Sequence, residues 1–490
     1  MENHTFFTVD LGATSGRTIL ASFDGCRMEM TELTRFDNPI IPLGGHLFWD
    51  IAHLYNEILK GLRLAAKTGE RIDSIGIDTW GCDFVCFGRD GQLLGLPYCY
   101  RDPHTDGARE RFFRKMPSDE LYGRSGIQFM NFNSVFQIDT LKTEGCQALE
   151  AAEKILFIPD ALSYMLTGEA VCEYTVASTS QLLNCSEREI DPAILSAVCM
   201  DREKFGRMVT PGTVIGKLST QIQEHTGLGE VPVVAVAGHD TASAVAAVPA
   251  LNPDFAYLSC GTWSLLGIES PHPIISEESY ANNFTNEGGV DGTIRFLKNI
   301  CGMWIFEQCR KELADAPDDI VELISSCSTT SFDSLIDPDA ECFAHPSSMK
   351  NAIDGYCRAT GQAVPASAAE YCRCIFASLA LRCRQVTGLL REMSPHPVEC
   401  LNVIGGGSRN AFLMQYLADA LGIRVICGPV EGTAMGNALL QARAAGLIGS
   451  LQRMREVVAA SVSLKEYAPQ RNCDREYEKF VNVQKNYKIR

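Results

Sequence analysis

The stretch TVDLGATSGRTIL, residues 8–20, contains the pattern that decides the fold. Apolar and β-branched residues end at Asp10, a run of small residues follows, and a second apolar run begins after Arg17. This pattern predicts a strand, a tight turn and a second strand. Such a turn exposes backbone N–H groups, and Thr14 and Ser15 add hydroxyls, so it can hold a phosphate without a lysine. Ordinary hairpins share this composition, so the turn alone leaves both interpretations open.

A second stretch repeats this order of strand, turn and strand. It is YLSCGTWSLLGIES, residues 257–270, in which Thr262 lies in a turn rich in glycine and serine. Two such turns, one in each half of the chain, favour a nucleotide whose phosphates are held from both sides. The repetition predicts two domains of related structure, residues 1–246 and 247–490.

Size and charge narrow the class of protein. The chain has 490 residues, beyond the roughly 250–300 at which a single core stops growing, so two domains are expected on length as well. A net charge of −17 argues against a nucleic acid or an anionic membrane as partner, because both attract basic surfaces. No long apolar run predicts a membrane span, and no signal-peptide pattern opens the chain. We therefore expect a cytoplasmic protein whose twenty cysteines are reduced thiols.

The second half ends in two α/β units, at residues 398–422 and 423–446. Each predicts a strand, a glycine-containing loop and a helix, and this alternation favours a largely parallel, covered sheet. The first loop, IGGGSRN, places Gly406 between the strand and the helix. Its glycines allow a ligand to approach the backbone, or they serve helix–strand packing. No lysine-containing P-loop occurs in the sequence.

Two further stretches carry candidate chemistry. In DTWGCDF, residues 78–84, Trp80 stands between Asp78 and Asp83, an arrangement that suits a sugar; the alternative is a hairpin corner with one buried tryptophan. In GHDT, Asp240 stands where a buried strand turns into a helix. Aspartate there is typical of a helix cap, since the helix start stabilises an anion. The second interpretation is a general base for a substrate hydroxyl.

Together these stretches make the chain resemble the FGGY family of carbohydrate kinases along nearly its whole length. Within that family, the DTWG and NEGG stretches are typical of members that phosphorylate L-rhamnulose. The resemblance is carried by VDLGATSGR (9–17), RIDSIGIDTWGCDF (71–84), SGIQF (125–129), GHDTASAVAAVP (238–249), YLSCGTWSLLGIES (257–270), TNEGG (285–289), LKNICGMW (297–304), IGGGSRN (404–410) and GIRVICGPVEGTAMGN (422–437).

The resemblance implies an α/β, two-domain actin/hexokinase-like (ribonuclease H-like) fold with an interdomain cleft. It also implies ATP-dependent phosphorylation of L-rhamnulose at the 1-hydroxyl, with Mg²⁺ as cofactor and a monomer as the favoured state. Alternatives are a kinase of another ketose such as fuculose or xylulose, or a non-enzymatic actin-like nucleotide switch or sugar sensor.

The resemblance also implies roles for single residues. Asp240 becomes the catalytic base, which replaces the cap as our prediction, and Asp10 becomes the metal residue. The implied nucleotide contacts are Ala13, Thr14, Ser15, Gly16, Arg17, Thr262, Glu307 and Gly406. The implied sugar contacts are Gly81, His239, Asp240, Thr241 and Asn299.

Two features concern how the chain compares with this family. Such kinases usually carry glutamine eight residues beyond the asparagine of LKN, whereas this chain has Glu307 followed by Gln308. A carboxylate there is expected to move or weaken a nucleotide contact. The spacing of Cys357 and Cys374 resembles a pair for which a bridge is sometimes inferred in the family; in a reducing compartment we expect thiols.

Overall fold

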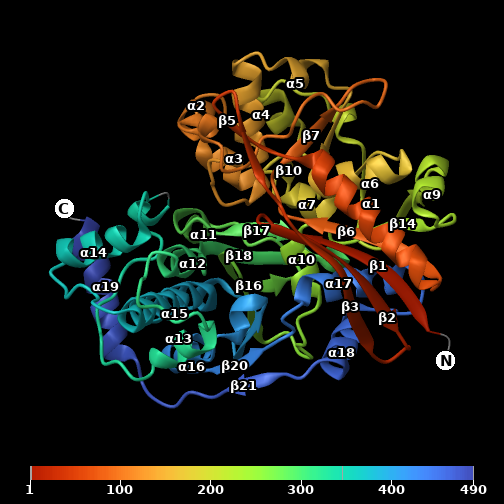
Figure 1. Ribbon diagram of the computed structural model, residues 1–490. Helices are drawn as coiled ribbons and strands as arrows, with labels where there is room; N and C mark the ends of the chain where they lie inside the picture. The colour runs from red at the N-terminus through yellow and green to blue at the C-terminus, as the bar shows by residue number, and fades with distance from the viewer. Residues whose placement is uncertain (1–2, 345, 489–490) are drawn as a thin grey trace. The chain divides into compact units, whose positions relative to one another are not determined.

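The computed structural model describes residues 3–344 and 346–488 (Figure 1). By its internal contacts the chain divides into two compact units. Unit 1 comprises Met1–Leu251, Glu269–Phe296 and Gly432–Ser461. Unit 2 comprises Asn252–Ile268, Leu297–Glu431 and Val462–Arg490. Each unit is therefore assembled from separate segments of the chain. The division of the sequence after residue 246 stays a prediction.

A six-stranded mixed sheet forms the centre of unit 1, in the order β13-β14-β6-β1-β2-β3. β1 is antiparallel to β2 and parallel to β6, and β6 is parallel to β14. The predicted hairpin at the start of the chain is confirmed, with Asp10 opposite Arg17 in its register. The strands are β1 (His4–Leu11), β2 (Ser15–Phe23), β3 (Met28–Asp37), β6 (Ile72–Thr79), β13 (Thr213–Lys217) and β14 (Pro232–Ala235).

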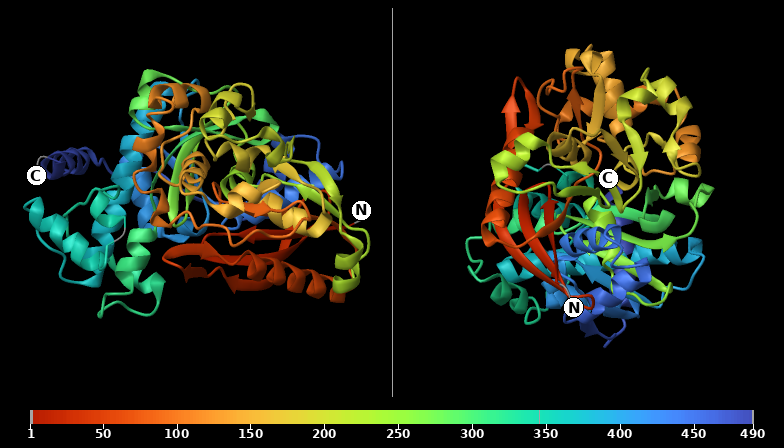
Figure 2. Two further views of the ribbon diagram at one scale, coloured as in Figure 1. Left: turned by 90° about the horizontal axis from the view of Figure 1, so that it is seen from above. Right: turned by 90° about the vertical axis from the view of Figure 1, so that its right-hand side faces the viewer.

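Helix α1 (Ile51–Thr68) packs along this sheet, where Figures 1 and 2 show it beside the N-terminal strands. Its start is fixed by Asp50, whose side chain accepts a hydrogen bond from the N–H of His53. Gly69, with φ of 75°, ends it in the left-handed conformation that glycine adopts without strain. At Gly61 a side chain would collide with Thr18 of β2, so glycine permits the close approach of helix and sheet.

The other elements of unit 1 include those that build a second hydrophobic core, separate from the core of the sheet. They are β4 (Ile40–Leu43), β5 (His46–Trp49), β7 (Phe84–Phe87), η1 (Pro103–Thr105), α2 (Ala108–Phe112), α3 (Ser118–Ser125), α4 (Ser134–Thr143), α5 (Gln147–Ala151), β8 (Lys154–Phe157), α6 (Ile158–Thr167), β9 (Val171–Glu173), α7 (Tyr174–Ser178), β10 (Leu183–Asn184), β11 (Glu189–Ile190), α8 (Pro192–Ala197), η2 (Arg202–Phe205), β12 (Arg207–Val209), α9 (Thr220–Thr226), α10 (Asp240–Ala246), α11 (Glu277–Ala281), η3 (Val290–Gly292), α17 (Gly432–Ala444) and α18 (Leu451–Ser461).

A second, seven-stranded sheet has the order β17-β18-β16-β15-β19-β20-β21. β15 is antiparallel to β16 and parallel to β19, so the strand–turn–strand pattern of the first sheet does recur. The prediction of a largely parallel sheet is wrong in part, because the hairpin and the last strand add antiparallel neighbours. The strands are β15 (Phe255–Cys260), β16 (Trp263–Ser270), β17 (Thr285–Gly288), β18 (Ile294–Cys301), β19 (Cys400–Ile404), β20 (Arg424–Cys427) and β21 (Lys465–Tyr467).

Helices complete unit 2, the longest of them being α15. An apolar stripe recurs at helical spacing along α15, at Ile375, Leu379, Cys383, Val386 and Leu390, and it is buried. The helices are α12 (Trp304–Arg310), α13 (Ile320–Ser326), η4 (Glu341–Phe343), α14 (Met349–Ala359), α15 (Ala368–Met393), η5 (Gly406–Arg409), α16 (Ala411–Leu421) and α19 (Asp474–Lys488). No helix in the described part of the chain combines the length and the apolar character needed to cross a bilayer. All twenty cysteines are free thiols, Cys357 and Cys374 included.

Candidate active site

Three parallel segments of unit 1 end at the same edge of its sheet. Asp10 at the end of β1 lies opposite Asp78 at the end of β6. Beyond β14, the carbonyl of Gly238 accepts a hydrogen bond from the N–H of Thr79 at 2.8 Å, so Asp240 follows directly beside β6. Ligands of open α/β sheets bind at the carboxyl ends of the strands. This edge is therefore the candidate active site of unit 1.

The edge concentrates negative charge around Asp78. Its side chain is fully buried, and burial raises its pKa well above the usual range; the carboxylates of Asp10 and Asp240 raise it further. Asn437 opposes this by donating to Oδ2 at 2.6 Å. Oδ1 is buried and has no hydrogen-bond partner among the described residues. Arg17 compensates part of the charge through its 2.7 Å ion pair with Asp10.

These side chains fit a hydrated magnesium ion. Mg²⁺ prefers oxygen ligands and usually binds through one or two carboxylates, several waters and substrate phosphates. Asp10 and Asp78 supply two adjacent carboxylates, one with a buried oxygen that lacks a donor. No group of three or more His, Cys, Asp or Glu side chains able to hold a metal occurs within residues 3–344 and 346–488. The chain therefore supports an ion completed by water and substrate, not an all-protein metal cage.

The turn between β1 and β2 is held in place by backbone hydrogen bonds. The N–H of Gly12 donates to the carbonyl of Ser15 at 2.9 Å. Asn38 braces the turn from outside: its N–H donates to the carbonyl of Thr14 and its Nδ2 to that of Gly12, both at 3.0 Å. Gly16 has no room for a side chain, since an added Cβ would lie 2.5 Å from an aromatic ring of β3. Thr14 is exposed, so a preorganised turn presents its outer side to a ligand.

Asp240 is the first residue of α10, and its two carboxylate oxygens differ in environment. Oδ1 accepts hydrogen bonds from the N–H of Thr241 at 2.5 Å and from its hydroxyl at 3.0 Å. Oδ2 has no hydrogen-bond partner in the described part of the chain, and the side chain is 30% exposed. One oxygen thus stabilises the start of the helix while the other is available to a substrate. The N-cap of α10 is His239, which makes no side-chain cap hydrogen bond, so the cap interpretation is wrong for Asp240; its carboxylate lies in the first turn, where the helix start favours a negative charge.

His239, which precedes Asp240, lies in a buried network that no pattern in the sequence predicts. Its Nδ1 is 3.1 Å from Nη2 of Arg295 and 3.3 Å from Oε2 of Glu287, and its Nε2 is 3.4 Å from Oδ1 of Asp240. Arg295 is fully buried and lies 3.1 Å from Glu287. Burial raises the pKa of Glu287, but the Arg295 charge and His239 outweigh it and hold that pKa below its usual value. The NEGG stretch contained Glu287, whereas nothing in the sequence marked Arg295.

The turn around Trp80 does not present Asp83 to a sugar. The Asp83 side chain is fully buried and accepts hydrogen bonds from the indoles of Trp49 at 2.6 Å and Trp80 at 2.9 Å and from Gln137 at 2.9 Å. Burial raises the pKa of Asp83 to about 6. The hypothesis that Asp83 is a sugar acceptor beside Trp80 is therefore wrong, and Trp80 is itself buried, as the alternative of a corner with a buried tryptophan has it. Gly81, half-buried beside this corner, stays a predicted sugar contact.

Two loops of unit 2 that are predicted to contact the nucleotide lie next to each other. The turn after β15 holds Thr262, and the loop after β19 holds Gly406. Both border Cys260, since an added Cβ at Gly405 would lie 3.0 Å from its carbonyl oxygen and one at Gly407 would collide with its side chain. Packing therefore explains these two glycines. Gly406 is exposed and an added Cβ would meet nothing within 4 Å, which favours a ligand as its reason.

The remaining predicted residues of unit 2 are Asn299 and Glu307. Asn299 is half-buried in β18. Glu307 lies in the first turn of α12, 41% exposed, and forms a 3.2 Å ion pair with Arg310 one turn later. The carboxylate that replaces the family's usual glutamine is thus already engaged with a cation of its own helix. The nucleotide role of Glu307 stays a prediction.

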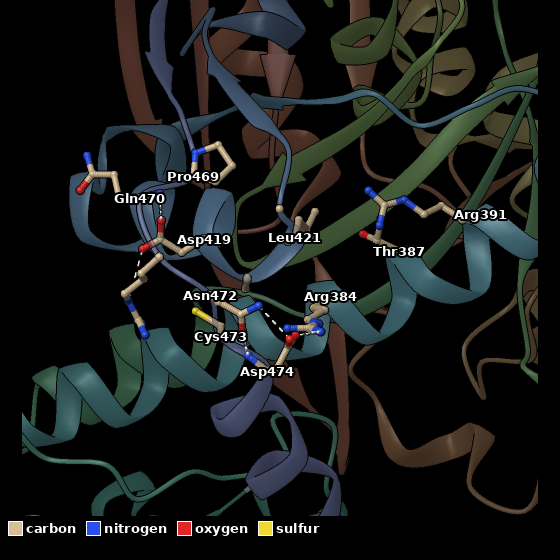
Figure 3. A pocket seen from close by; sticks show the side chains of 13 residues that line it. Arg384, Thr387, Arg391, Asp419, Leu421, Pro469, Gln470, Asn472, Cys473 and Asp474 are labelled. Atoms are coloured by element: carbon tan, nitrogen blue, oxygen red, sulfur yellow. Dashed lines mark hydrogen bonds and ion pairs between the residues drawn. The ribbon is translucent and has the colours of Figure 1, made fainter.

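A cavity of about 520 Å³ also lies in unit 2, between α15, the end of α16 and the segment before α19 (Figure 3). None of the predicted site residues lines it. Two of its arginines are ion-paired, Arg384 with Asp474 at 2.6 Å and Arg471 with Asp419 at 3.4 Å. The charged side chains of this cavity are therefore largely ion-paired. The candidate catalytic residues lie at the carboxylate edge of unit 1 instead.

Comparison with known proteins shows that both halves of the chain match models of one protein family. The N-terminal domain model of the FGGY family of carbohydrate kinases matches residues 5–247, and the C-terminal domain model of the same family matches residues 256–445. Together the two matches cover most of the chain. They include the β1–β2 turn, the segment ending in Asp240, and the loops of Thr262 and Gly406.

Individual relatives extend this match. A rhamnulokinase of Bacteroides thetaiotaomicron is 57% identical over 95% of this chain and 96% of its own length. A rhamnulokinase of Pectobacterium atrosepticum is 43% identical over 95% of this chain and 93% of its own. The solved gluconate kinase of Lactobacillus acidophilus superimposes with a TM-score of 0.80 over 100% of this chain and 97% of its own, at 16% identity. The structural likeness confirms the two-domain actin/hexokinase-like fold, and at that identity it speaks to the fold alone.

Proposed function

The chain belongs to the FGGY family of carbohydrate kinases, and from this premise we propose that it transfers the γ-phosphoryl group of ATP to the 1-hydroxyl of L-rhamnulose. Both rhamnulokinases described above match it over almost their entire lengths. We place the enzyme in the cytoplasm as a monomer, in the catabolism of L-rhamnose. The products are ADP and L-rhamnulose 1-phosphate.

The observation that carries the proposal is the carboxylate of Asp240. Two donors of Thr241 occupy its Oδ1, and its Oδ2 lacks a partner among the described residues at a position 30% exposed. A general base needs an acceptor oxygen within hydrogen-bond reach of the proton that it removes. In our proposal, Oδ2 accepts the proton of the 1-hydroxyl as its oxygen attacks the γ-phosphorus. His239 and Thr241 then lie beside the sugar.

Phosphoryl transfer asks the protein chiefly for positioning and for stabilisation of charge. The rigid β1–β2 turn supplies backbone N–H groups, and Thr14, Ser15 and Arg17 supply further donors toward a phosphate. When bound, Mg²⁺ would neutralise phosphate charge, and Asp10 and Asp78 would hold it through water molecules. These two carboxylates are adjacent in the register of β1 and β6.

Unit 2 contributes the proposed contacts to the nucleoside part of ATP. Gly406 has open space where a side chain would stand, and Thr262 occupies the neighbouring turn. Glu307 is available to a nucleotide only if its ion pair with Arg310 rearranges. We therefore assign adenosine binding mainly to the Gly406 loop.

The experiment is ADP release, followed by an optical coupled assay, with Mg·ATP and a panel of ketoses. L-Rhamnulose is expected to give the highest kcat/KM, well above L-fuculose and D-xylulose. A higher kcat/KM on another ketose would overturn the substrate and keep the kinase. If ATP binds while no sugar stimulates ADP release, the alternative of a nucleotide switch replaces the enzyme.

A further inference from the structure

We propose that Arg295 is a positioning residue that fixes the tautomer of His239, so that the ring nitrogen next to Asp240, Nε2, carries the proton. Glu287 serves as the counter-ion that holds Arg295 in place. The kinetic part of this inference rests on the proposed function. The tautomer itself can be measured without any substrate.

The three side chains of this network are buried, unlike those of a surface ion pair. Arg295 has no exposed side-chain area, and Glu287 and His239 have 6% and 10%. Arg295 makes two hydrogen bonds and one charge contact: Nε donates to the carbonyl of Gly288 at 2.9 Å, Nη2 is hydrogen-bonded to His239 at 3.1 Å, and Nη1 lies 3.1 Å from Oε2 of Glu287 without a hydrogen bond. A charge buried to this extent persists only when it is paired and hydrogen-bonded.

The donors of this network decide where the imidazole proton resides. A guanidinium has N–H donors and no acceptor. Because Nη2 of Arg295 makes its hydrogen bond to Nδ1 of His239, Nδ1 must carry the lone pair. The proton of the neutral ring then sits on Nε2. Oε2 of Glu287 makes no hydrogen bond and lies 3.3 Å from Nδ1, so it favours the opposite tautomer. In our proposal the hydrogen bond from Arg295, at 3.1 Å, outweighs it, and the charge of Nη1 compensates the carboxylate.

This tautomer completes the asymmetry of the Asp240 carboxylate. Nε2 of His239 is 3.4 Å from Oδ1 of Asp240, the same oxygen that accepts both hydrogen bonds from Thr241. With a proton on Nε2, the N–H of His239 lies on the side of Oδ1, at a charge-contact distance and without a hydrogen bond, while the two Thr241 donors are hydrogen-bonded to that oxygen and none of the three occupies Oδ2. The opposite tautomer would turn a lone pair toward the carboxylate and repel it. Arg295 thus acts on the base through His239, without touching the substrate.

Backbone packing fixes the distance between Arg295 and its partners. Gly288, whose carbonyl receives Nε, has no room for a side chain, because an added Cβ would lie 2.5 Å from the ring of Tyr174. Its N–H donates to the hydroxyl of Ser178 at 2.8 Å. The strand that carries Glu287 is therefore held against both ends of α7, at Tyr174 and Ser178. A shorter cation at position 295 would be unable to make all three contacts.

The test compares three conservative variants by ¹⁵N NMR of histidine-labelled protein and by steady-state kinetics. Arg295→Lys keeps the charge and removes the guanidinium geometry. Glu287→Gln removes the counter-ion and leaves the bond between Arg295 and His239. Glu269→Gln is the matched control, since Glu269 pairs with another buried arginine of unit 1, Arg455.

In the wild type we expect His239 to show an unprotonated Nδ1 and a protonated Nε2. Arg295→Lys should populate the other tautomer and lower kcat by about 10- to 100-fold, with a smaller change in KM, because the base loses its orientation. Glu287→Gln should lower the midpoint of thermal unfolding and keep the tautomer. Glu269→Gln should lower the same midpoint without affecting His239 or kcat.

A wild-type His239 protonated on Nδ1 would overturn the proposal, whatever the kinetics. So would an Arg295→Lys protein with unchanged tautomer and unchanged kcat. If the expected tautomers are found but no ketose is phosphorylated, the proposed function fails and the positioning role of Arg295 stands.

Discussion

The contact between α10 and α17 makes a strong prediction for Gly436→Ala. Gly436 in α17 lies against the backbone of Ser243 in α10, and an added Cβ would lie 2.6 Å from the Ser243 carbonyl carbon and closer still to its oxygen. Carbon atoms in contact are normally about 3.5–4.0 Å apart, so the carbon contact alone requires the helices to separate by about 1 Å, and the closer oxygen requires more. Backbone atoms on one side and a new methyl on the other leave no rotamer that would relieve the overlap.

Both helices carry parts of the candidate site. α10 begins at Asp240, and α17 holds Asn437, which donates to Asp78 at 2.6 Å. Overpacking typically costs about 1–3 kcal/mol of unfolding free energy. A displacement of about 1 Å at the base is expected to lower kcat/KM by about 100-fold. Gly436→Ala should therefore lose both stability and activity.

Urea unfolding and the ADP-release assay measure the two effects on the same protein. Gly388→Ala is the control, because Gly388 lies in α15 and an added Cβ there meets nothing within 4 Å. That variant should be more stable by about 0.5–1 kcal/mol, as alanine suits a helix better than glycine does. If Gly436→Ala retained wild-type stability and kcat/KM, the tight α10–α17 contact would be refuted.

Three further predictions follow from single residues. The folded-state pKa of Asp83, about 6, lies above its ordinary value of 3.8. The free energy of unfolding should therefore fall by up to about 3 kcal/mol from this group as the pH rises from about 4 to about 6. In urea titrations, Asp83→Asn should lack this part of the pH dependence, and an identical pH dependence would contradict the assignment. Asp78→Asn removes a buried carboxylate whose pKa is raised by burial. At pH 7 the free energy of unfolding of this variant, measured in urea, should rise by about 0.5–2 kcal/mol, and its activity should require a higher Mg²⁺ concentration. A loss of stability would argue against a charged Asp78 in the folded protein. Gly406→Ala should leave thermal unfolding unchanged and raise the KM for ATP about tenfold, and an unchanged KM would remove Gly406 from the nucleotide site.

Local patterns in the sequence were sufficient for the hairpins and their turns. β-Branched runs broken by small residues predict strand and turn from neighbouring residues alone, and both hairpins are present. The apolar stripe of α15 is buried for the same reason: its period is a property of one segment. The direction of the strands was less predictable, because the pairing partner of each strand lies far away in the sequence.

In the candidate site, too, features set by neighbouring residues were predictable and features set by distant residues were not. Asp240, His239 and the β1–β2 turn stood out because each lies at a visible junction of strand and turn. Asp83 misled because its type suggested an acceptor for a ligand, whereas two indoles and Gln137 occupy it. The sequence did not predict a role for Arg295. A buried arginine in a strand is recognised as functional only when its partners, here Glu287 and His239, are located in space.

The most direct test of the account is the comparison of Asp240→Asn with the wild type on Mg·ATP and L-rhamnulose. Sugar binding is measured by calorimetry and turnover by ADP release. We predict that the variant binds L-rhamnulose within a few-fold of the wild type and loses several orders of magnitude in kcat, because the amide retains an acceptor toward Thr241 but cannot take the proton. A variant that turns over L-rhamnulose at the wild-type rate would contradict the assignment of Asp240 as the base.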